Sequence, residues 1–148
     1  MIALDTNLLV YAHREDSKWF LKADKIITNL AESDQPWFIP WPCIHEFLAI
    51  VTHKKIYNPP TPIQDALIQI DYWLESPRLR LLGEGTPEHY WPYARDILNS
   101  GGIVGPMVHD ARIAALCIQH GISNLYTTDR HFNRMKGLQT FNPLLVES

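Results

Sequence analysis

Four acidic residues stand where a fold could bring them together: Asp5, Glu46, Asp110 and Asp129. Each lies where an apolar stretch ends or where a helical pattern begins. Clustered carboxylates repel one another, and a cation that neutralises them makes the cluster tolerable. Carboxylate oxygens suit Mg²⁺ and Mn²⁺. The sequence therefore predicts a carboxylate site for a divalent cation, with Mg²⁺ or Mn²⁺ as the cofactor.

The elements that must position these acids alternate between strand and helix patterns. This alternation favours an α/β fold with a mostly parallel sheet, because parallel neighbours need crossover connections. We expect a three-layer α/β/α arrangement. Thr61 is predicted to cap one of the helices. Strands are predicted at residues 2–4, 37–40, 79–82, 124–128 and 138–141, and helices at 8–12, 18–30, 42–51, 62–73, 87–99 and 108–120.

This architecture places the acids near one crevice. In open α/β sheets, sites form at the carboxyl ends of the strands. Asp5 and Asp129 each follow a predicted strand, Asp110 lies in the first turn of a helix, and Glu46 lies on the helix after another strand. Taken singly, each acid is equally well explained as a helix cap or a surface charge. The prediction therefore depends on the set.

Length and composition indicate one domain spanning residues 1–148. The chain has 148 residues, of which 46% are hydrophobic, enough for one core. No stretch approaches the roughly 20 apolar residues that cross a bilayer. Met1 is followed at once by a predicted strand, which leaves no room for a signal peptide, so we expect a cytoplasmic protein.

Cys43 and Cys117 lack metal or redox spacing and are predicted to be buried thiols.

The net charge of the chain neither favours nor excludes a nucleic-acid partner. The net charge is −3, but without the four proposed ligands 12 of the 16 acidic residues remain against 13 basic ones. Local basic residues near the acids are candidates for phosphate contacts, and ordinary surface charge is an equal alternative for each. His109 and His131 adjoin two of the acids, and a structural role is open for both. The candidates for phosphate contacts are Lys54, Lys55, Arg112, Arg130 and His131, with Arg134 and Lys136 nearby.

Several other enzyme classes are excluded by spacing. His45-Glu46 is followed by His53 and has no histidine three residues after the glutamate, so the zinc-protease pattern is absent. No phosphate-binding loop with its lysine occurs, and no serine nucleophile elbow is present. Metal-dependent hydrolysis remains the best enzymatic class.

The ordered motifs resemble the PIN-domain family, and within it the VapC-type toxin ribonucleases of toxin–antitoxin pairs. The resemblance spans the whole chain. It implies that the acidic quartet binds Mg²⁺ or Mn²⁺ for endonucleolytic cleavage of RNA, and that Thr6, Asn7 and Thr127 line or order the pocket. The motifs are residues 4–12 (LDTNLLVYA), 45–47 (HEF), 109–115 (HDARIAA) and 127–132 (TTDRHF).

The resemblance also implies partners and roles. It implies a VapB-like antitoxin, a homodimer, and transfer RNA or ribosomal RNA as substrate. Our hypothesis is that Asp5 is the central ligand, that Asp110 and Asp129 complete the coordination, and that Glu46 coordinates or orients the attacking water. Two alternatives stay open: a PIN nuclease of RNA processing or decay without an antitoxin, and a non-catalytic cation-binding interaction module.

Overall fold

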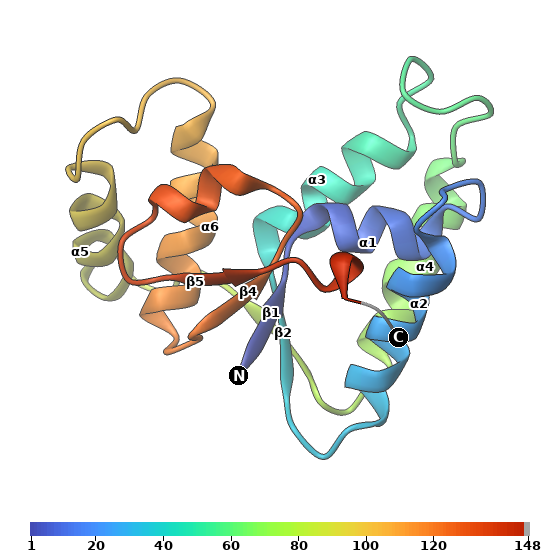
Figure 1. Ribbon diagram of the computed structural model, residues 1–148, viewed down its shortest axis with the longest axis horizontal. Coiled ribbons are helices and arrows are strands. Elements are labelled where there is room, and N and C mark those ends of the chain that lie inside the picture. Colours follow the sequence, from blue (N-terminus) through green and yellow to red (C-terminus); the bar gives the residue numbers. More distant parts are fainter. Residues whose placement is uncertain (147–148) are drawn as a thin grey trace.

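A five-stranded sheet forms the centre of the molecule in the computed structural model, which describes residues 1–146 (Figure 1). All four strand pairings are parallel, so the predicted mostly parallel sheet is confirmed. The strands lie in the order β3-β2-β1-β4-β5. They are β1 (Ile2–Leu4), β2 (Trp37–Pro40), β3 (Leu79–Leu82), β4 (Asn124–Tyr126) and β5 (Gln139–Phe141).

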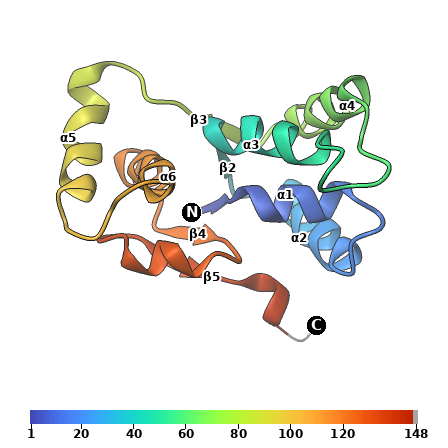
Figure 2. The same cartoon turned by 90° about the horizontal axis from the view of Figure 1, so that it is seen from above.

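Helices cover both faces of this sheet, which confirms the three-layer α/β/α prediction. Seen from above, α1 to α4 lie on one side of the sheet, and α5 and α6 lie on the other (Figure 2). The helices are α1 (Thr6–His13), α2 (Phe20–Glu32), α3 (Trp41–Val51), α4 (Ile63–Leu74), α5 (Pro87–Leu98) and α6 (Met107–Gln119). Two short 3-10 helices, η1 (Arg130–Arg134) and η2 (Pro143–Leu145), follow β4 and β5.

The core lies between the sheet and its two helical layers. Strands covered on both faces need apolar residues along their whole length, and all four residues of β2 are buried. Helix α6 is buried over most of its length, including Cys117, and α3 buries Cys43 and Phe47. Both cysteines are free and buried, as predicted.

None of the helices within residues 1–146 combines the length and the apolarity that a bilayer crossing requires.

Two local predictions were wrong. Strand β4 ends at Tyr126, so Thr127 and Thr128 lie beyond it, where their hydroxyls make side-chain contacts. Thr61 does not cap α4, whose N-cap position is taken by Pro62. The Thr61 hydroxyl instead accepts a hydrogen bond from Arg14 Nη1 at 3.1 Å and lies 3.1 Å from His13 Nε2. These contacts of the Thr61 hydroxyl hold the loop before α4 against the end of α1.

Candidate functional site

Asp5 forms the floor of the site, at the point where β1 ends and α1 begins. Its residue is only 5% exposed. One carboxylate oxygen, Oδ1, accepts a hydrogen bond from the Thr6 backbone N–H at 2.8 Å, which makes Asp5 the N-cap of α1. The other, Oδ2, accepts one from the Thr127 hydroxyl at 2.6 Å. One local and one long-range hydrogen bond thus fix the carboxylate in one orientation.

Burial raises the pKa of Asp5 to about 6 from its ordinary value of 3.8. The hydrogen bonds from Thr127 and Thr6 oppose this rise in pKa, while the nearby charges of Glu46 and Asp129 add to it. A buried carboxyl whose pKa is raised in this way gains most when a cation compensates its charge. The floor of the site therefore has the electrostatics of a cation ligand.

Glu46 reaches the same site from α3. Its Oε2 accepts a hydrogen bond from the Thr6 hydroxyl at 2.8 Å, so a residue of α1 holds a carboxylate of α3. The charge of Glu46 helps to raise the pKa of both Asp5 and Asp110. Glu46 therefore lies near the other acids, as predicted.

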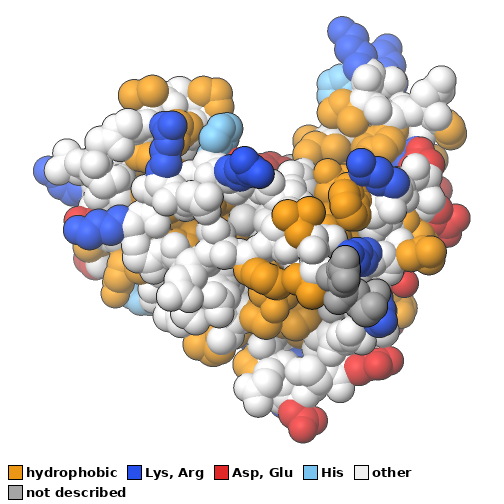
Figure 3. Space-filling view, viewed as in Figure 1, with side chains coloured by type: hydrophobic (Ala, Val, Ile, Leu, Met, Phe, Trp, Pro, Cys, Tyr) orange, Lys and Arg blue, Asp and Glu red, His pale blue; other side chains and the backbone are white. Residues whose placement is uncertain are grey.

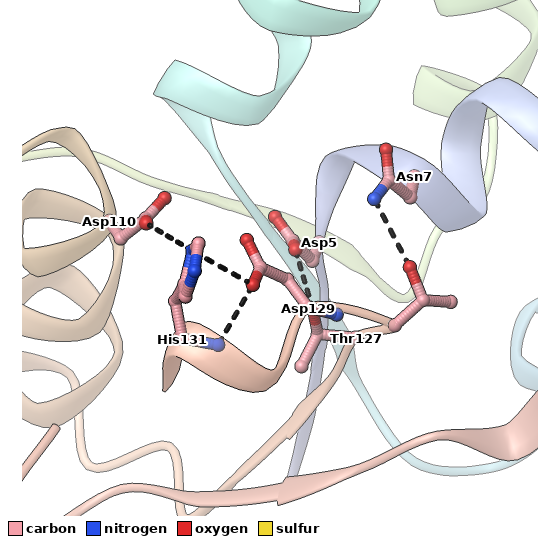
Figure 4. Close-up of polar contacts among 7 residues, drawn as sticks. Asp5, Asn7, Asp110, Thr127, Asp129 and His131 are labelled. Carbon is pink, nitrogen blue, oxygen red and sulfur yellow. Dashed lines mark hydrogen bonds and ion pairs between the residues drawn. The ribbon is translucent and has the colours of Figure 1, made fainter. Parts of the chain in front are cut away.

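Asp110 and Asp129 lie together on the opposite side, with His131 between them (Figure 4). His131 Nδ1 is 3.3 Å from Asp129 Oδ1 and 3.9 Å from Asp110 Oδ2. Asp129 is the N-cap of η1, because its Oδ1 accepts the His131 backbone N–H at 2.8 Å. Burial raises the pKa of Asp110, and the charges of Asp129 and Glu46 raise it further.

The three predicted pocket-supporting residues divide into two kinds. Thr6 and Thr127 contact acids directly, and the Thr127 hydroxyl also accepts a hydrogen bond from the Asp129 backbone N–H at 2.9 Å. Asn7 contacts no acid; its Nδ2 donates to the Thr128 hydroxyl at 3.1 Å, which links α1 to the segment after β4. Sequence reasoning did not single out Thr128. The pair of adjacent threonines before Asp129 is the signal by which it could have been found.

The donor set fits a divalent cation. Asp110, Asp129 and His131 each offer one ligand atom, and these three atoms lie within 4.8 Å of one another. The charges of Glu46 and Asp129 raise the pKa of both Asp5 and Asp110, and the four carboxylates together provide the oxygen ligands that Mg²⁺ and Mn²⁺ prefer. The sequence suggested a phosphate contact or a structural role for His131, and not a place among the metal ligands. Its spacing of two residues from Asp129, within the turn that Asp129 caps, is what brings the ring beside the acids.

The predicted basic residues are not all near the acids. Arg112 lies on α6 two residues after Asp110, and Arg130 is exposed at the start of η1. Lys54 and Lys55 lie in the loop after α3, which projects away from the sheet at the upper right of Figure 1. The structure therefore places His131 beside Asp110 and Asp129, and Arg112 in a small cavity with Glu46. Arg130 follows Asp129 in the chain, and Lys54 and Lys55 lie outside this group.

The chain is similar to several known proteins along nearly its whole length. A PIN domain model matches residues 2–138. A VapC ribonuclease of Mycobacterium bovis is 31% identical over 97% of this chain and 96% of its own length. Among solved structures, VapBC2 from Rickettsia felis, bound to a promoter DNA fragment, has a TM-score of 0.62 at 22% identity, covering 96% of this chain and 98% of that one. VapC20 of Mycobacterium tuberculosis, described as a sarcin–ricin loop cleaving toxin, has a TM-score of 0.64 at 16% identity, with coverage of 90% and 93%.

Proposed function

Because the chain belongs to the PIN-domain family and is related along its length to VapC ribonucleases, we propose that it is a toxin endoribonuclease that cleaves RNA with Mg²⁺ or Mn²⁺. The observation that carries the proposal is the convergence of the four acids at the carboxyl ends of β1 and β4. The pKa values of Asp5 and Asp110 are raised by burial and by the charges of Glu46 and Asp129, so ionising these two carboxyls is costly without a cation. Catalysis best explains this convergence of the four acids.

The residues of the chain have distinct tasks in this proposal. Asp5, Asp110 and Asp129 would hold the cation, with Glu46 completing its coordination or orienting the attacking water. A bound divalent cation would stabilise the charge that develops on the phosphodiester and make a water molecule more acidic. Thr6 fixes the carboxylate of Glu46, and Thr127 fixes those of Asp5 and Asp129 relative to each other. Preorganisation of this kind reduces the rearrangement needed during the reaction.

The proposal includes partners and location. A VapB-like antitoxin is the proposed regulator, supported by the likeness in fold to VapBC2. We further propose a homodimer, a cytoplasmic location, and transfer RNA or ribosomal RNA as the substrate. Arg112, Arg130 and His131 are the proposed phosphate contacts nearest the acids. Lys54 and Lys55 are retained as more distant ones.

The decisive experiment replaces Asp5 by its neutral isostere. Asp5→Asn should reduce cleavage of single-stranded RNA by at least about 100-fold, the scale on which loss of one strong electrostatic contribution acts. The matched control is Asp71→Asn, which neutralises an exposed acid on α4 and should leave the rate unchanged. Far-ultraviolet circular dichroism would verify that both variants are folded.

Three outcomes separate this proposal from its rivals. Full cleavage by Asp5→Asn would remove Asp5 from the active site. A cation that raises the melting temperature of the wild-type protein without any RNA cleavage would favour a cation-binding module. A PIN nuclease of RNA processing or decay is the less favoured alternative, because the relatives are VapC ribonucleases; the absence of a small antitoxin gene beside this one would support it.

A further inference from the structure

A small cavity adjoins the acids. It has a volume of about 180 Å³, and it is lined by Pro42, His45 and Glu46 of α3 and by His109 and Arg112 of α6. Glu46 thus belongs to both the acidic site and this cavity. The surface is notched between the parts built on α3 and on α6, and acidic, histidine and basic side chains lie around the notch (Figure 3). Typical small-molecule pockets begin at roughly 300 Å³, so this cavity suits one part of a nucleotide.

Arg112 is held in place by one hydrogen bond and keeps other donors for a ligand. Its Nε donates to Glu84 Oε1 at 2.7 Å, and its side chain is 47% exposed. Within residues 1–146, this is the one hydrogen bond that the guanidinium makes. Both terminal nitrogens therefore keep donors for a ligand at the cavity. The planar fork of an arginine matches the oxygens of a phosphate.

Trp41, at the start of α3, directly precedes Pro42, which lines the same cavity. It is 42% exposed, whereas Trp37 and Trp73 belong to the core and Trp19 is partly buried against it. Its ring lies 6.4 Å from the ring of His45, with an angle of 48° between the planes. His45 Nδ1 donates to the Trp41 carbonyl oxygen at 3.2 Å. The carbonyl can only accept, so this bond fixes the imidazole against the first turn of α3.

Gly83, in the loop after β3, lies close to the indole ring of Trp41. A Cβ atom there would lie 3.5 Å from Trp41 Cδ1, an ordinary contact distance. The Gly83 carbonyl accepts a hydrogen bond from His120 Nε2 at 2.8 Å, which ties this loop to the end of α6. The next residue, Glu84, holds Arg112. One loop therefore contacts both Trp41 and Arg112, and Arg112 shares the cavity with Glu46.

We propose that Trp41 and Arg112 bind the nucleotide next to the cleaved bond. Its base stacks on the exposed part of the indole, and its phosphate accepts hydrogen bonds from the Arg112 guanidinium inside the cavity. The identity of the ligand as RNA rests on the proposed ribonuclease function. Every base has a π-face, so this subsite positions the strand without selecting one base.

The test measures binding of a short fluorescein-labelled single-stranded RNA of mixed sequence. Fluorescence anisotropy gives the Kd in Mg²⁺, with all proteins carrying Asp5→Asn so that RNA is not consumed. Adding Trp41→Ala should raise the Kd at least about fivefold, the lower bound for loss of one base–aromatic stack. Trp41→Phe should restore most of the affinity. The matched control Trp91→Ala removes an exposed tryptophan on α5 and should leave the Kd unchanged.

Two further measurements separate stacking from charge. Arg112→Gln should weaken binding and reduce the dependence of log K on log salt by about 0.7, as expected for one lost phosphate contact on a single strand, while Trp41→Ala should leave that slope unchanged. An RNA with an abasic unit at the stacked position should bind the Trp41→Ala and Trp41 proteins equally. A structural effect of Trp41 would lower affinity for both RNAs.

The subsite and the proposed function fail in different ways. If Trp41→Ala binds the intact RNA as tightly as its parent, or if the parent does not bind RNA at all, the subsite is overturned. Cleavage is assayed separately with the unsubstituted protein. Absence of that cleavage would refute the ribonuclease proposal even where the Trp41 and Arg112 effects on binding are found.

Discussion

At the scale of single residues, Asp5 combines three properties that are seldom found together. It caps a helix, it is buried, and both of its oxygens accept hydrogen bonds. Even so, its pKa is raised to about 6, because burial disfavours the charge more than the two donors stabilise it. In the cation-free protein, the ionised form of this carboxyl is therefore destabilising.

This property predicts how stability depends on pH. The pKa of Asp5 is higher in the folded than in the unfolded protein, so its stabilising contribution is present below about pH 4 and is lost as pH rises through about 6. The loss is on the order of 3 kcal/mol. Asp5→Asn should remove it, because the amide oxygen can still accept from Thr6 N–H and the amide group can donate to the Thr127 hydroxyl.

The measurement is urea unfolding in chelator at about pH 4.5 and about pH 7.5. The free energy of unfolding of Asp5→Asn should exceed that of the wild-type protein clearly at the higher pH and much less at the lower one. Asp71→Asn should track the wild-type protein at both values. A wild-type protein that is the more stable of the two at high pH would contradict the pKa assigned to Asp5.

At the scale of elements, register brings the acids together. Strands β1 and β4 pair in parallel with Leu4 opposite Tyr126, so the next residues, Asp5 and Thr127, leave the sheet side by side. The 2.6 Å hydrogen bond between them follows directly from this register. Helices α3 and α6 then supply Glu46 and Asp110 from opposite faces of the sheet. Each element contributes one acid, and packing sets the distances.

The bridge between the two strand ends can be broken by one substitution. Thr127→Val keeps the shape of the side chain and removes the hydroxyl that lowers the pKa of Asp5. The pKa of Asp5 should then rise above 6, so the acid side of the pH–rate profile for RNA cleavage should move to higher pH. Stability should fall by roughly 1–3 kcal/mol, since the Asp129 N–H also loses its acceptor.

Thr140→Val is the matched control for this substitution, because the Thr140 hydroxyl donates to Asn133 at 2.8 Å, away from the acids. Its pH–rate profile should coincide with that of the wild-type protein. An unchanged profile for Thr127→Val would show that the hydroxyl does not tune Asp5.

At the scale of the whole molecule, the helical layer formed by α2 and α4 is incompletely covered. Residues of α4 that are exposed and apolar include Ile63, Leu67, Ile68 and Tyr72. A groove of about 690 Å³ separates α2 from α4, and acidic residues such as Asp24 and Asp65 lie among those that line it. Apolar surface of this extent is typical of a protein interface. We expect the antitoxin to cover it with an apolar and basic segment.

A charge placed in this groove should weaken the complex. Ile68→Glu should reduce copurification of a coexpressed antitoxin, because it buries an uncompensated charge beside acids already present. RNA cleavage by the isolated variant should be unchanged. Leu21→Glu alters an exposed apolar residue of α2 that does not line the groove, and it should retain the antitoxin. Equal retention by both variants would place the antitoxin elsewhere.

The sequence alone determined the class of fold and the identity of the four acids. Strand and helix patterns depend on residues close together in the chain, and the rule that parallel strands end at one edge then placed Asp5 and Asp129 in one crevice. The same reasoning placed the end of β4 too late in the chain. It also predicted that Thr61 caps a helix, and Thr61 does not. In both cases, contacts with distant residues decided the local structure.

Only the tertiary structure decided how the site behaves. The raised pKa of Asp5 depends on burial, and the place of His131 depends on the turn that Asp129 caps. The cavity shared by Glu46 and Arg112 exists because a loop after β3 packs against α3 and α6. Burial and long-range contacts are properties of packing, which residue types and spacing along the chain do not specify. The sequence therefore identified the chemical groups, and the fold set their charge, orientation and neighbours.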